Sequence, residues 1–261
     1  MTMKLIAAGL LTITLSACVT VTESRLTRKA SPEKAVENYT QLGLGYLQKS
    51  RPDLARQRLR KALEIDADYA PANDAMGLLW QAEGEMDLAE ESFHKSISGD
   101  SSFTMAKHHL GRLYMRMKRF DEAESWLRRA ATDPYYESRT AAYNDLALNY
   151  YRMKMPQDAV SAYRETLRIA PYNVDALVNI STLLFEARKY DESQKHYDRL
   201  YRLVERKQTR HTSHSLWLGI KLATIHQDVK RGVDLATQLK QEFPQSNEYR
   251  MYQESLAGVK N

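Results

Sequence analysis

The hydrophobic pattern of this chain repeats with a period of about 34 residues. The unit is a bulky apolar residue, then a small residue, then an aromatic residue or leucine three positions further on. It occurs as Leu42-Gly43…Tyr46, Met76-Gly77…Trp80, Leu110-Gly111…Tyr114, Leu146-Ala147…Tyr150 and Ile180-Ser181…Leu184. The small residues are spaced 34, 34, 36 and 34 positions apart. Such a period predicts a solenoid in which each unit packs against the next.

A second apolar motif follows each unit at a fixed distance. Twelve residues after the small residue stands another small residue, and four further on a large one. These pairs are Ala55 and Leu59, Ala89 and Phe93, Ala123 and Leu127, Ala159 and Tyr163, and Ser193 and Tyr197. Each repeat therefore predicts two antiparallel helices whose small residues meet where the axes cross closely.

The start of each second helix is marked by polarity. Two residues before its small residue stands Asp53, Asp87, Asp121, Gln157 or Asp191. An aspartate suits the N-terminal end of a helix, either as a cap or as a partner of the helix dipole.

These features together resemble the tetratricopeptide repeat, whose period is 34 residues. Pro171 also matches the proline that closes such a repeat. The resemblance implies an all-α fold, a solenoid of about six antiparallel helix pairs with a C-terminal capping helix.

The sixth repeat is weaker than the other five. It restarts at Leu218-Gly219…Leu222, 38 residues after Ser181, and the extra residues fall around 203–212. We expect them to lengthen the preceding helix by about one turn. A second helix is expected near 228–242, so the six repeats occupy 34–245 and the capping helix 246–261.

The chain begins with a pattern typical of an export signal. Lys4 precedes an apolar run from Leu5 to Leu15, and small residues precede Cys18. This predicts a signal peptide over 1–17, and the run is too short for a transmembrane helix, which needs about 20 residues.

The segment Leu15-Ser16-Ala17-Cys18 resembles the bacterial lipobox. The resemblance implies that Cys18 is acylated and anchors the chain in a lipid bilayer. Val19 follows it in place of the aspartate typical of inner-membrane retention, which favours the periplasmic face of the outer membrane. Residues 18–33 would form the acylated N-terminus and a flexible tether. The alternative is an ordinary signal peptide with an incidental cysteine.

Composition narrows the function classes. Only 10 Gly and 7 Pro occur in 261 residues, which suits long helices better than an all-β fold. The net charge is +5, but both signs are interleaved, so no nucleic-acid partner is expected. The single cysteine excludes a disulfide framework and a cysteine-based zinc site.

Catalytic and metal-binding patterns are weak. His108 and His109 are adjacent on a helix, and His211 and His214 lack a third ligand at suitable spacing. The sequence has no glycine-rich phosphate loop, serine elbow or catalytic cysteine motif. We expect no metal, no cofactor and no enzymatic activity. The alternative from another class is a lipid-anchored cell-wall hydrolase, which would need a set of catalytic residues that the sequence lacks.

A binding role remains. In tetratricopeptide repeats, the first helices line a groove, and carrying over its positions implies a partner-binding set. The set is Leu44, Leu47, Asp74, Leu78, His108, Arg112, Asn144, Leu148, Tyr151 and Arg152. It would be apolar near the N-terminus and basic in the middle, where amides can bind a peptide backbone and arginines carboxylates. The alternatives are solvated faces for the arginines and partial burial against an adjoining helix for the leucines.

A lipobox followed by six such repeats resembles the type IV pilus biogenesis and stability lipoproteins, the pilotins of the pilus secretin. The supporting stretches are 38–47, 144–151 and 215–219. The resemblance implies a monomeric lipoprotein that helps the secretin subunit reach the outer membrane and form multimers, supporting pilus biogenesis and twitching motility. The repeats alone indicate only a peptide-binding scaffold. The alternative is a periplasm-facing scaffold for outer-membrane protein insertion or peptidoglycan synthesis.

Overall fold

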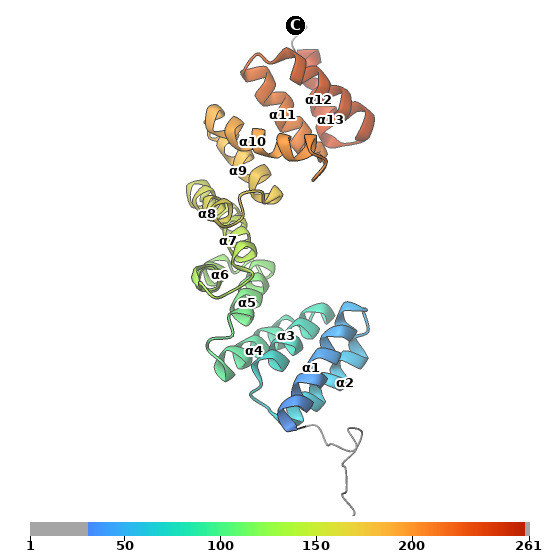
Figure 1. Ribbon diagram of the computed structural model, residues 1–261, viewed down its shortest axis with the longest axis vertical. Coiled ribbons are helices and arrows are strands. Elements are labelled where there is room, and N and C mark those ends of the chain that lie inside the picture. Colours follow the sequence, from blue (N-terminus) through green and yellow to red (C-terminus); the bar gives the residue numbers. More distant parts are fainter. Residues whose placement is uncertain (1–30, 259–261) are drawn as a thin grey trace, which may run out of the picture.

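The computed structural model describes residues 31–258, which form thirteen α-helices and no strand. Twelve helices form six antiparallel pairs, and one helix follows them (Figure 1). The pairs are α1 (Pro32–Gln48) with α2 (Pro52–Ile65), α3 (Ala70–Glu83) with α4 (Met86–Gly99), α5 (Thr104–Arg116) with α6 (Phe120–Thr132), α7 (Arg139–Arg152) with α8 (Pro156–Ile169), α9 (Val174–Glu186) with α10 (Tyr190–Glu205), and α11 (Ser213–Ile225) with α12 (Val229–Glu242). The last helix is α13 (Asn247–Gly258). The predicted all-α solenoid of six pairs with a capping helix is confirmed. Cys18 and the predicted signal peptide lie outside the described residues.

The second helices of the first five pairs begin with an acidic first turn, and two of them also with proline. Pro52 and Pro156 occupy the first turns of α2 and α8, where a missing backbone N–H costs nothing. The first turns of α2, α4, α6, α8 and α10 contain Asp53, Asp87, Asp121, Asp158 and Asp191. None of these five helices has a side-chain cap, so the aspartates act on the helix dipole and the capping interpretation is wrong. In α8 the acidic residue stands one position after Gln157.

The turn between the two helices of a pair uses one left-handed residue. In the second pair this residue is Gly84, with φ of 89°. The equivalent turns of the other five pairs use Ser50, Lys118, Lys154, Arg188 and Gln227, with φ of 54°, 61°, 59°, 58° and 58°. This conformation lets the chain reverse within a few residues and brings the second helix back along the first.

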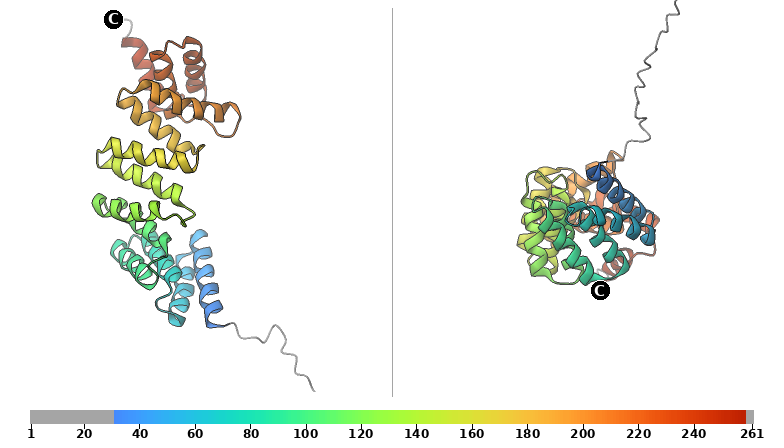
Figure 2. Two further views of the ribbon diagram at one scale, coloured as in Figure 1. Left: turned by 60° about the vertical axis from the view of Figure 1, so that its left-hand side comes forward. Right: turned by 90° about the horizontal axis from the view of Figure 1, so that it is seen from below.

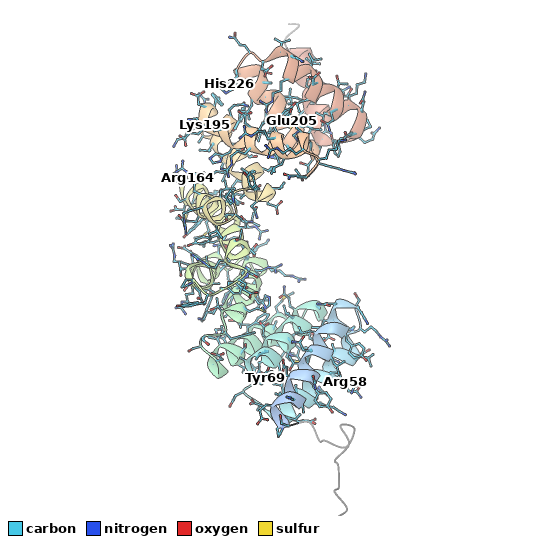
Figure 3. The ribbon with its side chains drawn as sticks, viewed as in Figure 1. Arg58, Tyr69, Arg164, Lys195, Glu205 and His226 are labelled. Atoms are coloured by element: carbon cyan, nitrogen blue, oxygen red, sulfur yellow. The ribbon has the colours of Figure 1, made fainter. Side chains whose placement is uncertain are left out.

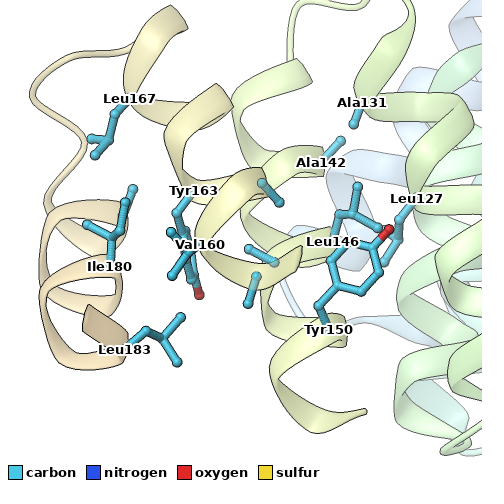
Figure 4. Packing of buried hydrophobic residues seen from close by; sticks show 14 of the residues in the cluster. Leu127, Ala131, Ala142, Leu146, Tyr150, Val160, Tyr163, Leu167, Ile180 and Leu183 are labelled. Carbon is cyan, nitrogen blue, oxygen red and sulfur yellow. The ribbon is translucent and has the colours of Figure 1, made fainter. Parts of the chain in front are cut away.

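The small residues of both motifs lie at the helix crossings. Ala55, Ala89, Ala123, Ala159 and Ser193 are fully buried. Around them, one continuous hydrophobic cluster extends from Ala89 to Leu222. Figure 4 shows part of it, with Tyr150 beside Leu127 and Leu146, and Tyr163 facing Ile180 and Leu183. Tyr114, Tyr150, Tyr163 and Tyr197 are therefore core residues, and the second to sixth pairs share this cluster.

The junction between the fifth and sixth pairs differs from the others. Helix α10 has 16 residues against 14 in α8, so the insertion adds about half a turn and the rest forms the loop 206–212. The expected full turn is therefore wrong. Arg231 of α12 crosses this junction: its guanidinium lies 4.1 Å from the ring centre of Tyr201, and it donates to Asp198 at 2.7 Å.

The stack is curved, and its first helices lie on the inner side. Contacts skip from one first helix to the next, α1 with α3, α3 with α5 and α5 with α7. Figures 1 and 2 show the arc, with α6 and α8 on the outer side. Over residues 31–258, no helix combines the length and apolar character that a membrane span requires.

Candidate protein-interaction surface

The inner face of the arc is formed by α1, α3, α5 and α7, and it carries the ten predicted groove residues. The structure places these residues in three environments: half-buried, buried, and exposed. These environments decide which of them a partner can reach.

The four leucines are half-buried. Leu44 and Leu47 pack against the cluster that contains Leu59 and Leu79. Leu78 and Leu148 pack against the main core. Partial burial against adjoining helices, the alternative for Leu44, Leu47 and Leu78, is therefore correct, and each leucine offers a partner only part of its side chain.

Asp74 and His108 do not line an accessible groove, which corrects that expectation. They are 3% and 4% exposed. The carboxylate of Asp74 accepts a hydrogen bond from Nδ1 of His109 at 2.8 Å. His108 reaches the opposite way and donates from Nε2 to Asp145 at 2.9 Å.

Two adjacent histidines of α5 thus connect it to the first helices on either side. His109 binds backward to α3, and His108 binds forward to α7. Since Nε2 of His108 donates to a carboxylate, its Nδ1 can accept from the hydroxyl of Tyr136, which is 2.9 Å away. Burial raises the pKa of Tyr136, which keeps this hydroxyl protonated. The network joins three consecutive repeats.

The exposed members of the set lie on α5 and α7. The Arg112 side chain is 58% exposed, and its Nε is 3.6 Å from Asp145. Tyr151 is 51% exposed, and Arg152 is exposed with Nη1 3.5 Å from the carbonyl of Met115. Asn144 is half-buried, and its amide donates to Asn173 at 3.3 Å. Arg112, Tyr151 and Arg152 are the predicted residues most open to a partner.

An open pocket of about 290 Å³ lies between α3 and α5 on this face. Leu78 and Ala82 supply apolar surface, and Gln81 and His109 add polar groups. Arg112 and Arg116, one turn apart, complete the lining. We call this the arginine pocket.

A second surface was missed from the sequence. We call it the α1 end face: Asn38, Gln41, Leu42, Gly45, Tyr46 and Lys49, which line an open groove of about 600 Å³. Leu42 is 49% exposed, whereas its repeat equivalents Met76, Leu110, Leu146, Ile180 and Leu218 are at most 7% exposed. No preceding pair covers α1 in the described chain, so the residue that is core elsewhere is surface here. Its place in the first repeat was the signal that could have revealed this.

The outer face is polar and rich in charged residues. Arg164 and Lys195 lie on the outer side of the arc in Figure 3. Arg164 pairs with Glu192 at 2.9 Å, and both side chains are largely exposed.

Within residues 31–258, no three or more His, Cys, Asp or Glu side chains gather as a metal site. His211 and His214 point to different partners, Ser215 and Thr182.

Comparison with known proteins identifies the repeats and a relative that matches nearly the whole chain. Models of the tetratricopeptide repeat match residues 36–69 and 101–171. The type IV pilus assembly protein PilF of Pseudomonas aeruginosa is 32% identical over 254 residues, which cover 97% of this chain and 99% of that protein.

Solved structures of related proteins have the same fold. A structure of Pseudomonas aeruginosa PilF matches with a TM-score of 0.77 at 32% identity, covering 86% of this chain and 99% of that one. PilW, described as a widely conserved type IV pilus biogenesis factor, shares the fold with a TM-score of 0.68 at 20% identity, covering 83% and 97%.

Proposed function

Because the chain belongs to the family of the type IV pilus assembly protein PilF, built from tetratricopeptide repeats, we propose that it is a pilotin. In this role it binds the secretin subunit of the type IV pilus and promotes its arrival and multimer assembly at the outer membrane. It thereby supports pilus biogenesis and twitching motility as a protein-binding scaffold and not as an enzyme.

Membrane attachment is the second part of the proposal. Acylation of Cys18 would hold the protein on the periplasmic face of the outer membrane. Helix α1 begins at Pro32, so only a short segment separates Cys18 from the first repeat. The α1 end face would then be the end of the solenoid that follows the anchor most directly along the chain.

The observation that carries the proposal is the accessible apolar surface of α1. Leu42 lies at a position that every later first helix buries, and Tyr46 lines the same groove. A partner segment that covers Leu42 would gain the burial that Met76 and Leu110 already have. The half-buried leucines of the inner face, Leu44 and Leu78, form the adjoining second contact.

Secretin multimers in cells test both surfaces. Leu42→Glu places a charge on the α1 end face without removing a buried side chain, so it should reduce heat-resistant secretin multimers on gels. Leu44→Glu combined with Leu78→Glu should do the same through the inner face. Circular dichroism of each purified variant should show retained helix, which separates loss of binding from loss of folding.

The matched control is charge reversal on the second helices, Arg58→Glu with Lys95→Glu. Arg58 lies on α2 and Lys95 pairs with Glu91 on the surface of α4. This variant should form wild-type amounts of multimers. Cross-linked outer membranes should also yield the secretin with the wild-type protein. Normal multimers in both leucine variants, or recovery of another outer-membrane assembly factor without the secretin, would contradict the proposal.

A further inference from the structure

The arginine pocket combines an apolar floor with positive charge. Leu78 packs on the main core from one side and lines the pocket with Ala82 on the other. Arg112 and Arg116 project from α5 four residues apart and are both exposed. Residues at this spacing lie on the same face of a helix, so both guanidinium groups border the same pocket.

The acidic groups beside the pocket are already engaged. Asp74 accepts from His109, and Asp145 accepts from His108, with Arg112 at the longer distance of 3.6 Å. Arg116 has no ion-pair partner within residues 31–258. The pocket lining thus contains two arginines and no carboxylate, and because Arg112 is shared with Asp145, the charge of Arg116 is the one left for a partner.

A third guanidinium lies next to this pair. Nη1 of Arg152 on α7 is 3.5 Å from the carbonyl of Met115, the neighbour of Arg116. The helix dipole favours a positive charge in the last turn of α5, which is reason enough for an arginine at position 116. It gives no reason for the arginine at position 112, one turn earlier. Arg112 and Arg116 thus line the pocket, and Arg152 of the next repeat contacts the backbone beside Arg116.

We propose that the arginine pocket binds an acidic protein segment, with a carboxylate held by Arg112 and Arg116 and a neighbouring apolar side chain on Leu78 and Ala82. A guanidinium binds a carboxylate through two parallel hydrogen bonds, which gives geometry as well as charge. The Gln81 amide can donate to or accept from the backbone of the same segment. The inference rests on the proposed function, because it gives the chemistry of the partner segment that the inner face receives.

Peptide binding to the purified protein tests the pocket without the secretin. The probe is a fluorescent peptide of alternating glutamate and leucine, compared with peptides in which glutamine or lysine replaces glutamate, all measured by anisotropy. Glutamine in the peptide, or Arg112→Gln with Arg116→Gln in the protein, should each weaken binding about tenfold. The two changes together should weaken it no further than either alone, and added salt should weaken wild-type binding.

The matched control is Arg202→Gln with Arg206→Gln, which removes the same charge at the same spacing at the end of α10, where both residues are exposed. It should bind the glutamate peptide as the wild type does. If the double pocket variant loses its fold, the single Arg116→Gln replaces it, with about threefold weakening expected. Unchanged affinity in the pocket variant, no binding of the glutamate peptide, or equal binding of the lysine peptide would overturn the inference. Since no probe comes from the secretin, secretin multimers in cells report separately on the proposed function.

Discussion

The ring of Phe93 on α4 fills the space that a side chain on Gly77 of α3 would need. A Cβ on Gly77 would lie 2.6 Å from Cε1 and 2.7 Å from Cδ1 of that ring. Leu127 blocks Gly111 in the next repeat in the same way, with Cγ at 2.7 Å. The absence of a side chain on the first helix is therefore what allows a large one on the second.

Substitution of these glycines should destabilise the fold. Gly77→Leu or Gly111→Leu inserts atoms into a close-packed crossing, and so does Ala89→Leu or Ala123→Leu on the facing helix. Each should lower the free energy of unfolding by about 1–3 kcal/mol or more, measured by urea denaturation.

Gly45 provides the matched control on α1. It is also a helical glycine, but a Cβ there would meet nothing within 4 Å. Gly45→Ala should raise stability by about 0.5–1 kcal/mol, because alanine loses less backbone entropy in a helix. Wild-type stability in all four crossing variants would show that the assigned register is wrong.

The helix pairs could be predicted from the sequence because the residues that pack against each other at a helix crossing must recur at a fixed spacing along the chain. Gly77 and Phe93 must oppose each other wherever the pair recurs, so the residue types return at a fixed period. The sixth pair follows the same spacing through Gly219, whose added Cβ would lie 2.8 Å from Cδ1 of Leu235 and closer still to Tyr197 of the preceding pair.

The accessibility of the inner face could not be predicted in the same way. Repeat positions locate Asp74 and His108 on the first helices, but their burial depends on which polar partner the neighbouring helix presents. Adjacent His108 and His109 bind different repeats, and a periodic pattern contains no information about such pairing. Leu42 is exposed because it belongs to the first repeat, which no preceding pair covers in the described chain. Its exposure therefore differs from that of the equivalent residues in the inner repeats.

The contact between Asp74 and His109 should stabilise the arc independently of any partner. Asp74 is buried, and His109 is its hydrogen-bond partner across α3 and α5. Asp74→Ala leaves the His109 donor unpaired and should cost about 1–3 kcal/mol of unfolding free energy. In a double-mutant cycle, Asp74→Ala should cost much less when His109 is already alanine. Additive losses in the cycle would contradict this coupling.

Cys18 can be tested directly although it lies outside the described residues. Cys18→Ser removes the thiol that the lipobox resemblance implies is acylated. The variant should leave the outer-membrane fraction and appear as a soluble or uncleaved form, and it should lose incorporation of labelled palmitate. Wild-type protein without label, together with unchanged fractionation of the variant, would contradict lipid anchoring.

His211 should make stability depend on pH. It is 4% exposed, its ring stacks against Tyr197 at a centroid distance of 6.2 Å, and Nδ1 is 3.0 Å from Oγ of Ser215. Nε2 is buried and has no hydrogen-bond partner within residues 31–258. Burial lowers the pKa of His211 from 6.5 to about 4; the charge of Glu242 opposes this shift, and that of Arg231 adds to it.

Between about pH 6.5 and pH 4, the unfolded chain therefore binds a proton at His211 that the folded chain does not. Stability should fall as the pH is lowered through this window, because protonation favours the unfolded state. His211→Gln removes the titration, so from pH 7.5 to about pH 4.5 the wild type should lose about 2 kcal/mol more than the variant. Urea denaturation at both pH values measures the difference. His214→Gln, which removes an exposed histidine three residues away, should retain the wild-type loss. An equal loss in the His211→Gln variant would show that the buried imidazole does not set the acid sensitivity of this junction.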